Sequence, residues 1–117
     1  MSIQYEAVFC VVNEGFSETV MYAARKAGAY GATIVKGHGS SGREAQEMFR
    51  IEIQPQKEIV MMVVPADIKD AVLKEVYNAA GLDSKGQGLA FSLPVTGTAG
   101  LSDFEKDKEE KQQDQGL

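Results

Sequence analysis

The sequence predicts a single α+β domain in which strands and helices alternate. Three observations support this prediction. Apolar, β-branched runs occur at residues 4–12, 32–35 and 58–64. Two intervening stretches repeat their apolar residues every three or four positions, as amphipathic helices do, and glycine-rich turns punctuate the pattern. With 117 residues, 44% of them hydrophobic, the chain is long enough for one compact domain with a modest core.

The first half of the chain is predicted to form a strand, a helix and a second strand. Residues 4–12 are β-branched and aromatic with few breaks, which is typical of a buried central strand. Residues 14–27 carry apolar side chains at helical spacing, and Gly28 then supplies the expected C-terminal stop. Residues 32–35 form a short strand that leads into a glycine-rich loop.

The middle of the chain is predicted to form a β-hairpin. Residues 49–53 alternate strictly between apolar and polar side chains, as in a strand with one solvated face. Pro55 and Gln56 are expected to turn the chain, and residues 58–64 form a second buried strand.

A second helix and a last strand complete the domain. The helix opens at Pro65 and ends at Gly81, and the strand at residues 89–93 is stopped by Pro94. With the hairpin counted as one β unit, the order strand-helix-strand-strand-helix-strand is the ferredoxin-like pattern, an antiparallel sheet with two helices on one face. Because the other face of such a sheet must also be covered, we expect a homo-oligomer that packs sheet faces together.

Charge and composition exclude several classes of function. A net charge of −5 argues against nucleic acid as a partner. No apolar stretch reaches the roughly 18 residues of a membrane span, and the N-terminus lacks the features of a signal peptide, so we expect a cytoplasmic protein. The domain is expected to cover residues 1–101, and the charged residues 102–117 to form a disordered tail.

The reactive side chains form no catalytic pattern. The single cysteine, Cys10, lies in an apolar run and is expected to be a small buried hydrophobe. His38 is the only histidine, and a lone histidine without a neighbouring cysteine is weak evidence for a metal site. With no Ser-His-Asp or Cys-His arrangement, we expect neither an enzyme nor a metal or other cofactor.

Two glycine-rich loops are the best candidates for a binding site. Glycine lets backbone N–H groups approach an anion closely, and serine and lysine add donors, so such loops can bind phosphate. The same clusters are also ordinary turn sequences, so either loop alone is compatible with a turn that binds nothing. The loops contain Gly37, His38, Gly39 and Ser40 in the first case and Lys85, Gly86, Gln87 and Gly88 in the second.

The arrangement of these motifs resembles the PII signal-transduction (nitrogen regulatory protein P-II) family, more specifically its divergent PII-like members. The resemblance covers most of residues 1–101. It is carried by Lys36-Gly37-His38-Gly39, Phe49, Val63-Val64-Pro65 and Gly86-Gln87-Gly88-Leu89-Ala90-Phe91. It implies a homotrimer that binds an adenine nucleotide in clefts between subunits. It also implies a mobile loop, here residues 39–48, that contacts partner proteins.

The resemblance implies a role for several residues. They are Gly31 and Thr33 as adenine contacts from the neighbouring subunit, Val64 near the base, Gly37 and Gly39 at the base of the mobile loop, and Gly86 and Gly88 at the phosphates. The family's loop aspartate is replaced by Gln87 and its following lysine by Leu89, although Lys85 offers a nearby charge. The two arginines that the family places after the last strand are absent from residues 96–102, which favours AMP, ADP or another small anion over ATP.

Two functions therefore remain open at the level of sequence. The favoured one is a regulatory protein that senses a small ligand, AMP, ADP or ATP, and controls a membrane transporter or a metabolic enzyme through its mobile loop. The alternative is a trimer of the same architecture that acts as a structural or metal-tolerance protein, like the copper-tolerance relatives with this fold.

Overall fold

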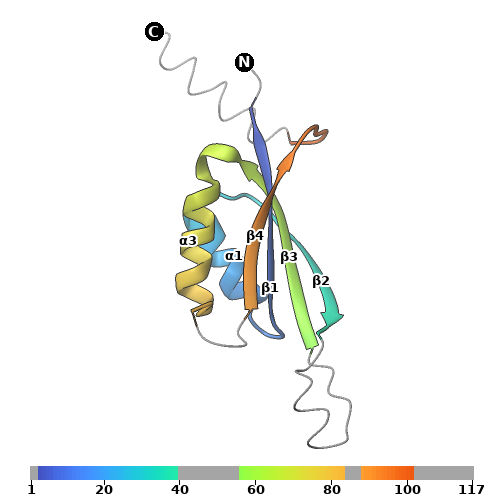
Figure 1. Cartoon of the computed structure of the whole chain (residues 1–117), viewed down its shortest axis with the longest axis vertical. Helices are drawn as coiled ribbons and strands as arrows, with labels where there is room; N and C mark the ends of the chain where they lie inside the picture. The colour runs from blue at the N-terminus through green and yellow to red at the C-terminus, as the bar shows by residue number, and fades with distance from the viewer. Residues whose placement is uncertain (1–2, 40–55, 84–87, 102–117) are drawn as a thin grey trace, which may run out of the picture.

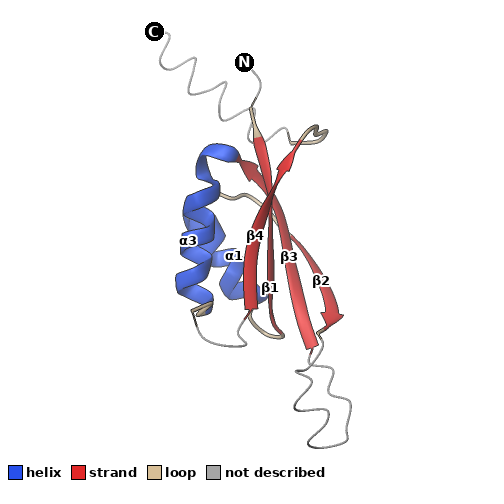
Figure 2. Cartoon of the chain, in the orientation of Figure 1, coloured by secondary structure: helices blue, strands red, loops and turns tan. Residues whose placement is uncertain are grey.

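The computed structural model describes residues 3–39, 56–83 and 88–101. Within these ranges, one four-stranded sheet packs against two α-helices (Figures 1 and 2). The strand order is β2-β3-β1-β4, and each neighbouring pair is antiparallel. This is the ferredoxin-like α+β fold that the sequence predicts.

The first half of the fold contains β1 (Tyr5–Asn13), α1 (Ser17–Lys26) and β2 (Thr33–His38). Helix α1 begins later than predicted because the Phe16 N–H donates to the Asn13 carbonyl and closes a turn first. Gly28, with a φ of 110°, follows the end of α1 in a conformation that favours glycine, as the predicted stop requires.

The second half contains β3 (Gln56–Pro65), the short 3₁₀ turn η1 (Ala66–Ile68), α3 (Lys69–Ala80) and β4 (Gly88–Val95). Gly81 ends α3 with left-handed backbone angles, φ 66° and ψ 39°. In the described part of the chain, no helix combines the length and the apolar character needed to cross a membrane.

The predicted hairpin between residues 49–53 and 58–64 is wrong in its pairing. Gln56 lies in β3 rather than in a turn, and β3 pairs with β2 from Gln56 opposite His38 to Met61 opposite Thr33. Strand β1 occupies the other edge of β3. Both edges of β3 next to the proposed turn are therefore taken, while residues 49–53 lie outside the described residues.

Pro94 does not stop the last strand, which continues to Val95. Strand β4 lies at the edge of the sheet and pairs with β1. An edge strand tolerates proline because the missing N–H can face the side on which no ladder is formed. A proline near the end of a strand pattern is therefore also compatible with an edge strand.

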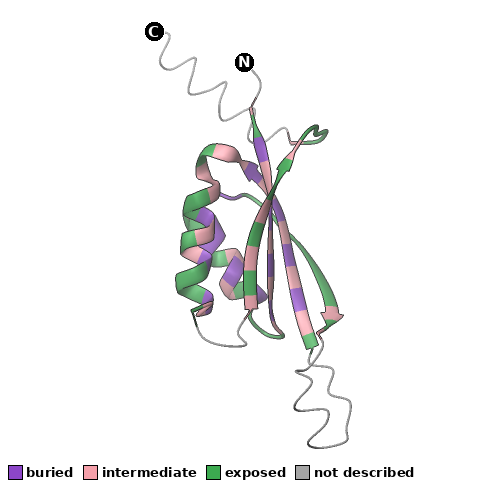
Figure 3. Cartoon of the chain, in the orientation of Figure 1, coloured by how far each residue is buried: buried purple, intermediate pink, exposed green. Residues whose placement is uncertain are grey.

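The core lies between the sheet and the helices (Figure 3). Alternate residues of the central strands point into it, including Val8 and Val12 of β1 and Val60 of β3, all essentially inaccessible to solvent. Cys10 belongs to the same row, and burial raises the pKa of its thiol to about 11. The expectation that Cys10 is a small buried hydrophobe is confirmed.

Glu58 is the one charged side chain in the described ranges that is buried. The Gly15 backbone N–H donates to its Oε1 at 2.6 Å, and the Ser17 hydroxyl donates to its Oε2 at 3.2 Å. The Gly15 N–H is the main cause that lowers the pKa of this carboxyl, and burial opposes it. The N-cap residue of α1, Phe16, makes no side-chain hydrogen bond to the helix. The Glu58 carboxylate of β3 instead accepts hydrogen bonds at the start of α1 and links the strand to the helix.

We expect the Glu58 carboxylate to make stability depend on pH. Its pKa is lower in the folded than in the unfolded chain, so its contribution is present above the unfolded value and lost as pH falls through the folded value. Glu58→Gln should lower the free energy of unfolding near pH 7, and the difference from the wild type should shrink below about pH 4.

Urea unfolding from about pH 7 down to about pH 3 measures this difference. Glu14→Gln, which removes a neighbouring but exposed carboxylate, is the matched control and should have little effect. A loss of stability in Glu58→Gln that is the same at every pH would show that the charge of Glu58 is not what matters.

Candidate ligand-binding site

The sheet face opposite the helices is apolar and is called the open face below. The strand register places Phe9 of β1, Met61 of β3 and Phe91 of β4 side by side on it. The rings of Phe9 and Phe91 stack with their centroids 5.2 Å apart. Leu89 and Leu93, in the same row of β4, are 53% and 51% exposed. Such a contiguous apolar surface is typical of an interaction site.

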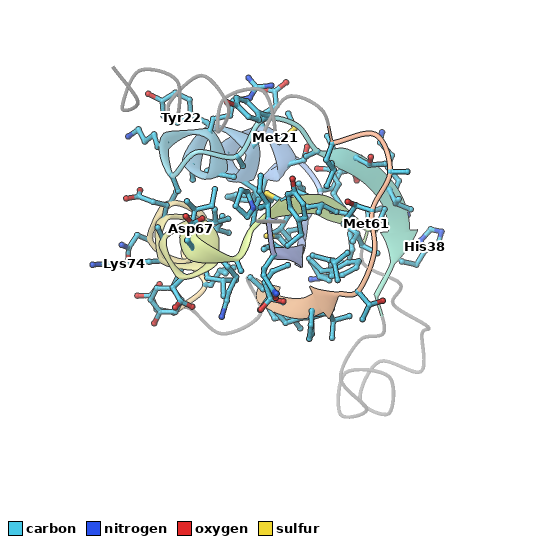
Figure 4. All side chains as sticks on the ribbon, turned by 90° about the horizontal axis from the view of Figure 1, so that it is seen from above. Met21, Tyr22, His38, Met61, Asp67 and Lys74 are labelled. Carbon is cyan, nitrogen blue, oxygen red and sulfur yellow. The ribbon has the colours of Figure 1, made fainter. Side chains whose placement is uncertain are left out.

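A cavity of about 510 Å³ lies at one end of the open face. Residues 96–101, called the strap below, leave β4 and cross toward the side of the sheet where β2 lies (Figure 4). The volume of the cavity falls within the range of small-molecule sites, roughly 300–1,000 Å³. The lining comprises Ala7 and Phe9 of β1, Met61, Met62 and Val63 of β3, Tyr30–Thr33 before and in β2, and Gly100 and Leu101 of the strap.

The cavity contains two of the three residues predicted near the base of a nucleotide. Gly31 and Thr33 both line it. Val64 does not, because its side chain is fully buried in the core between sheet and helices. Neighbouring residues of a strand point to opposite faces, so Val63 lines the cavity instead.

The other described candidates lie at the opposite end of the sheet, called the loop end below. Gly37, His38 and Gly39 lie at the end of β2, and Gly88 begins β4. Strand β2 separates Thr33 from His38, a distance of roughly 16 Å for an extended chain. Ser40, Lys85, Gly86 and Gln87, and most of the predicted mobile loop, lie outside the described residues.

His38 and Cys10 do not share a site. The His38 ring is exposed, and its Nδ1 lies 3.0 Å from Nε2 of Gln56 across the β2–β3 ladder. Cys10 points into the core from β1. Within residues 3–39, 56–83 and 88–101, no group of three or more His, Cys, Asp or Glu side chains is placed to hold a metal ion.

Lys57 is a candidate that the sequence analysis missed. It pairs with Gly37 and Asn13 in the sheet and therefore belongs to the open face at the loop end. Its Nζ donates to Oδ1 of Asn13 at 2.5 Å, and an ammonium group carries three N–H donors, so it can also donate to an anion. The alternation of β3 could have placed Lys57 in the row of Met61, but the residue was read as following a turn.

Gly88 is required by the fold itself. Its φ is 139°, and a β-carbon at this position would collide with the carbonyl oxygen of Val11 on the neighbouring strand. The close approach of β4 to β1 therefore explains glycine here without any ligand. A substitution at Gly88 reports on strand pairing before it reports on binding.

Comparison with known proteins gives the same architecture. No family model and no curated protein matches the sequence. Among the solved structures that match are two at 23% identity: PII from Arabidopsis thaliana bound to citrate, with a TM-score of 0.65, and a GlnK–ATP complex from B. subtilis, with a TM-score of 0.62. The first match covers 86% of this chain and 92% of that chain, and the second covers 84% and 87%. The chain has a PII-like fold. At the level of fold, this confirms the resemblance seen in the sequence.

We expect Gly88→Ala to destabilise the protein because the new β-carbon forces β4 away from the backbone of β1. A strained backbone position of this kind costs on the order of 1–3 kcal/mol, which should lower the midpoint of thermal unfolding by at least about 5 °C. Gly97→Ala is the matched control, since a β-carbon at Gly97 meets nothing within 4 Å. Equal melting temperatures for the two variants would contradict this account.

Proposed function

We propose that the protein is a regulatory protein with a PII-like fold that senses a small ligand, an adenine nucleotide or another small anion, in clefts between the subunits of a homotrimer. The observation that carries the proposal is the separation of the candidate residues. Gly31 and Thr33 lie at the cavity end, whereas Gly37, Gly39 and Gly88 lie at the loop end. One chain cannot bring both groups to one small ligand, but two neighbouring chains can.

The two ends of the sheet offer complementary chemistry for such a cleft. The cavity end supplies an apolar wall with the Thr33 hydroxyl. The loop end supplies the Lys57 ammonium beside Gly37, where the missing side chain leaves space next to it. A cleft with one apolar and one cationic wall suits a ligand that combines a ring with an anionic group.

The structural neighbours support this class of ligand. The B. subtilis GlnK is in complex with ATP and the Arabidopsis thaliana PII is bound to citrate, both of which are anions. For this chain we propose AMP or ADP ahead of ATP, because the strap, residues 96–101, contains no arginine or lysine. Citrate represents the class of other small anions in the experiments below.

The open face supports the proposed trimer. Helices cover only one side of the sheet, and the exposed leucines of β4 are left on the other. In the proposed trimer, copies arranged about a symmetry axis bury these surfaces against one another, and the proposal requires that the cavity end of one chain lie near the loop end of the next. The regulated partner, a membrane transporter or a metabolic enzyme contacted through residues 39–48, stays a prediction. No observation on the described residues favours the metal-tolerance alternative.

We expect Lys57→Ala to weaken the binding of ADP about tenfold or more, because a charge-assisted contact to phosphate contributes about 1.5–3 kcal/mol. Titration calorimetry with ADP, AMP and citrate on the wild type and the variant measures the effect. Binding of adenosine, which carries no phosphate, should change little.

Lys74→Ala is the matched control for this measurement. Lys74 carries the same charge but projects from the outer surface of α3, away from the open face (Figure 4). If Lys57→Ala and Lys74→Ala bind ADP equally well, the loop end does not hold the phosphate. If the wild type binds none of these compounds, the proposed function is wrong.

A further inference from the structure

The last turns of α1 carry an exposed patch formed by Tyr22, Arg25 and Lys26, called the α1 patch below. The Lys26 ammonium lies 5.0 Å from the centre of the Tyr22 ring, and Tyr22 is 66% exposed. Among the described residues, no ion pair joins Arg25 or Lys26 to a carboxylate. Glu18, the one acidic residue of α1, lies in the first turn at the other end of the helix. Two cations beside an aromatic ring suit an acidic segment that carries an aromatic side chain.

The described part of the chain ends close to the α1 patch. Leu101, its last residue, lines the cavity under the strap together with Tyr30. Tyr30 also borders a second, small cavity on the helix side, which Met21 and Arg25 line. The segment that follows Leu101 therefore starts next to the cationic end of α1.

Residues 102–117 have the composition that the α1 patch requires. They contain six acidic residues and three lysines, and acidic residues alternate with other residues from the start of the segment, at Asp103, Glu105 and Asp107. Phe104 is the only aromatic residue in the segment. An extended chain advances about 3.3 Å per residue, so about five residues after Leu101 can run along the roughly 15 Å of a ten-residue helix such as α1.

We infer that residues 102–107 dock on the α1 patch, with their carboxylates against the two cations and the Phe104 ring against Tyr22. Docking holds Leu101, and with it the strap, in place as a wall of the cavity. The contact depends on no ligand, and α1 lies on the side of the sheet away from the open face, so the α1 patch stays accessible in the proposed trimer. The inference gives a position to a segment that composition alone would leave disordered.

Tryptophan fluorescence tests the inference on the full-length protein. The chain contains no tryptophan, so Phe104→Trp introduces a single reporter into the docking segment. Its emission should lie at the shorter wavelengths of a partly buried indole and should be poorly quenched by acrylamide.

Reversal of one charge in the α1 patch should release the reporter. In the Phe104→Trp background, Arg25→Glu should lower the ratio of docked to free segment about fivefold, an effect of the size of one strong surface ion pair, and shift the emission to longer wavelength. About 1 M salt should shift it in the same direction, because the screening length then falls to about 3 Å. Arg25→Lys keeps the charge and should keep the emission of the docked segment.

Lys74→Glu is the matched control, because it makes the same change of charge on the outer surface of α3. It should leave the emission unchanged. Thermal unfolding shows whether each variant is folded, and if Arg25→Glu is not, Lys26→Glu takes its place in the same comparison.

Three results would overturn the inference. A fully exposed tryptophan in the otherwise unchanged chain would show that the segment is not docked. A buried tryptophan that responds neither to Arg25→Glu nor to salt would show that the segment docks on another surface. Equal responses to Arg25→Glu and Lys74→Glu would show that overall charge, rather than the α1 patch, controls the segment. Each of these results leaves the proposed function standing, because that function is tested by the binding of ADP, AMP and citrate.

Discussion

The apolar open face of the sheet is the constraint on which the rest of the structure depends. Strands β1 and β3 are apolar on both sides: Val8, Val12 and Val60 pack against the helices, while Phe9, Val11 and Met61 point the other way. Among the described residues, no second layer of helices covers that side. The hydrophobic effect therefore favours a partner on the open face, and a second copy of the same sheet offers a surface of matching chemistry.

This constraint also determines where a ligand can bind. Within the described residues, the strap and the Tyr30–Thr33 segment leave one end of the open face hollow and uncharged, while Gly37 and Lys57 make the other end open and cationic. In one chain these ends are separated by the length of β2. Assembly and ligand binding are therefore coupled in our account, because a complete site exists only where two chains meet.

The positions of most helices and strands were predictable from the sequence. The pairing of the strands, and the face of the sheet on which each side chain lies, were less predictable. Runs of apolar residues identified 4–12 and 58–64 as central strands. Such a run shows that a strand is buried but does not show which strand lies next to it, and the sequence analysis therefore paired β3 with the wrong segment. The side chains of adjacent strand residues point to opposite faces of the sheet, which explains why Val64 lies in the core and not at the cavity. Lys57 was overlooked because the sequence analysis placed it after a turn and not within a strand. Gly88 resembled a phosphate-loop glycine, yet its backbone angle and the nearby Val11 carbonyl give it a role in strand pairing.

The mass of the protein in solution tests the central claim most directly. At micromolar concentration, sedimentation equilibrium should give about three times the chain mass of 12.7 kDa. Leu93→Lys, which places a charge on the open face, should shift the protein toward the single-chain mass, whereas Tyr77→Lys, on the similarly exposed outer surface of α3, should not. A wild type that sediments as a folded monomer would contradict the account, because its open face would then be stable in water without a partner.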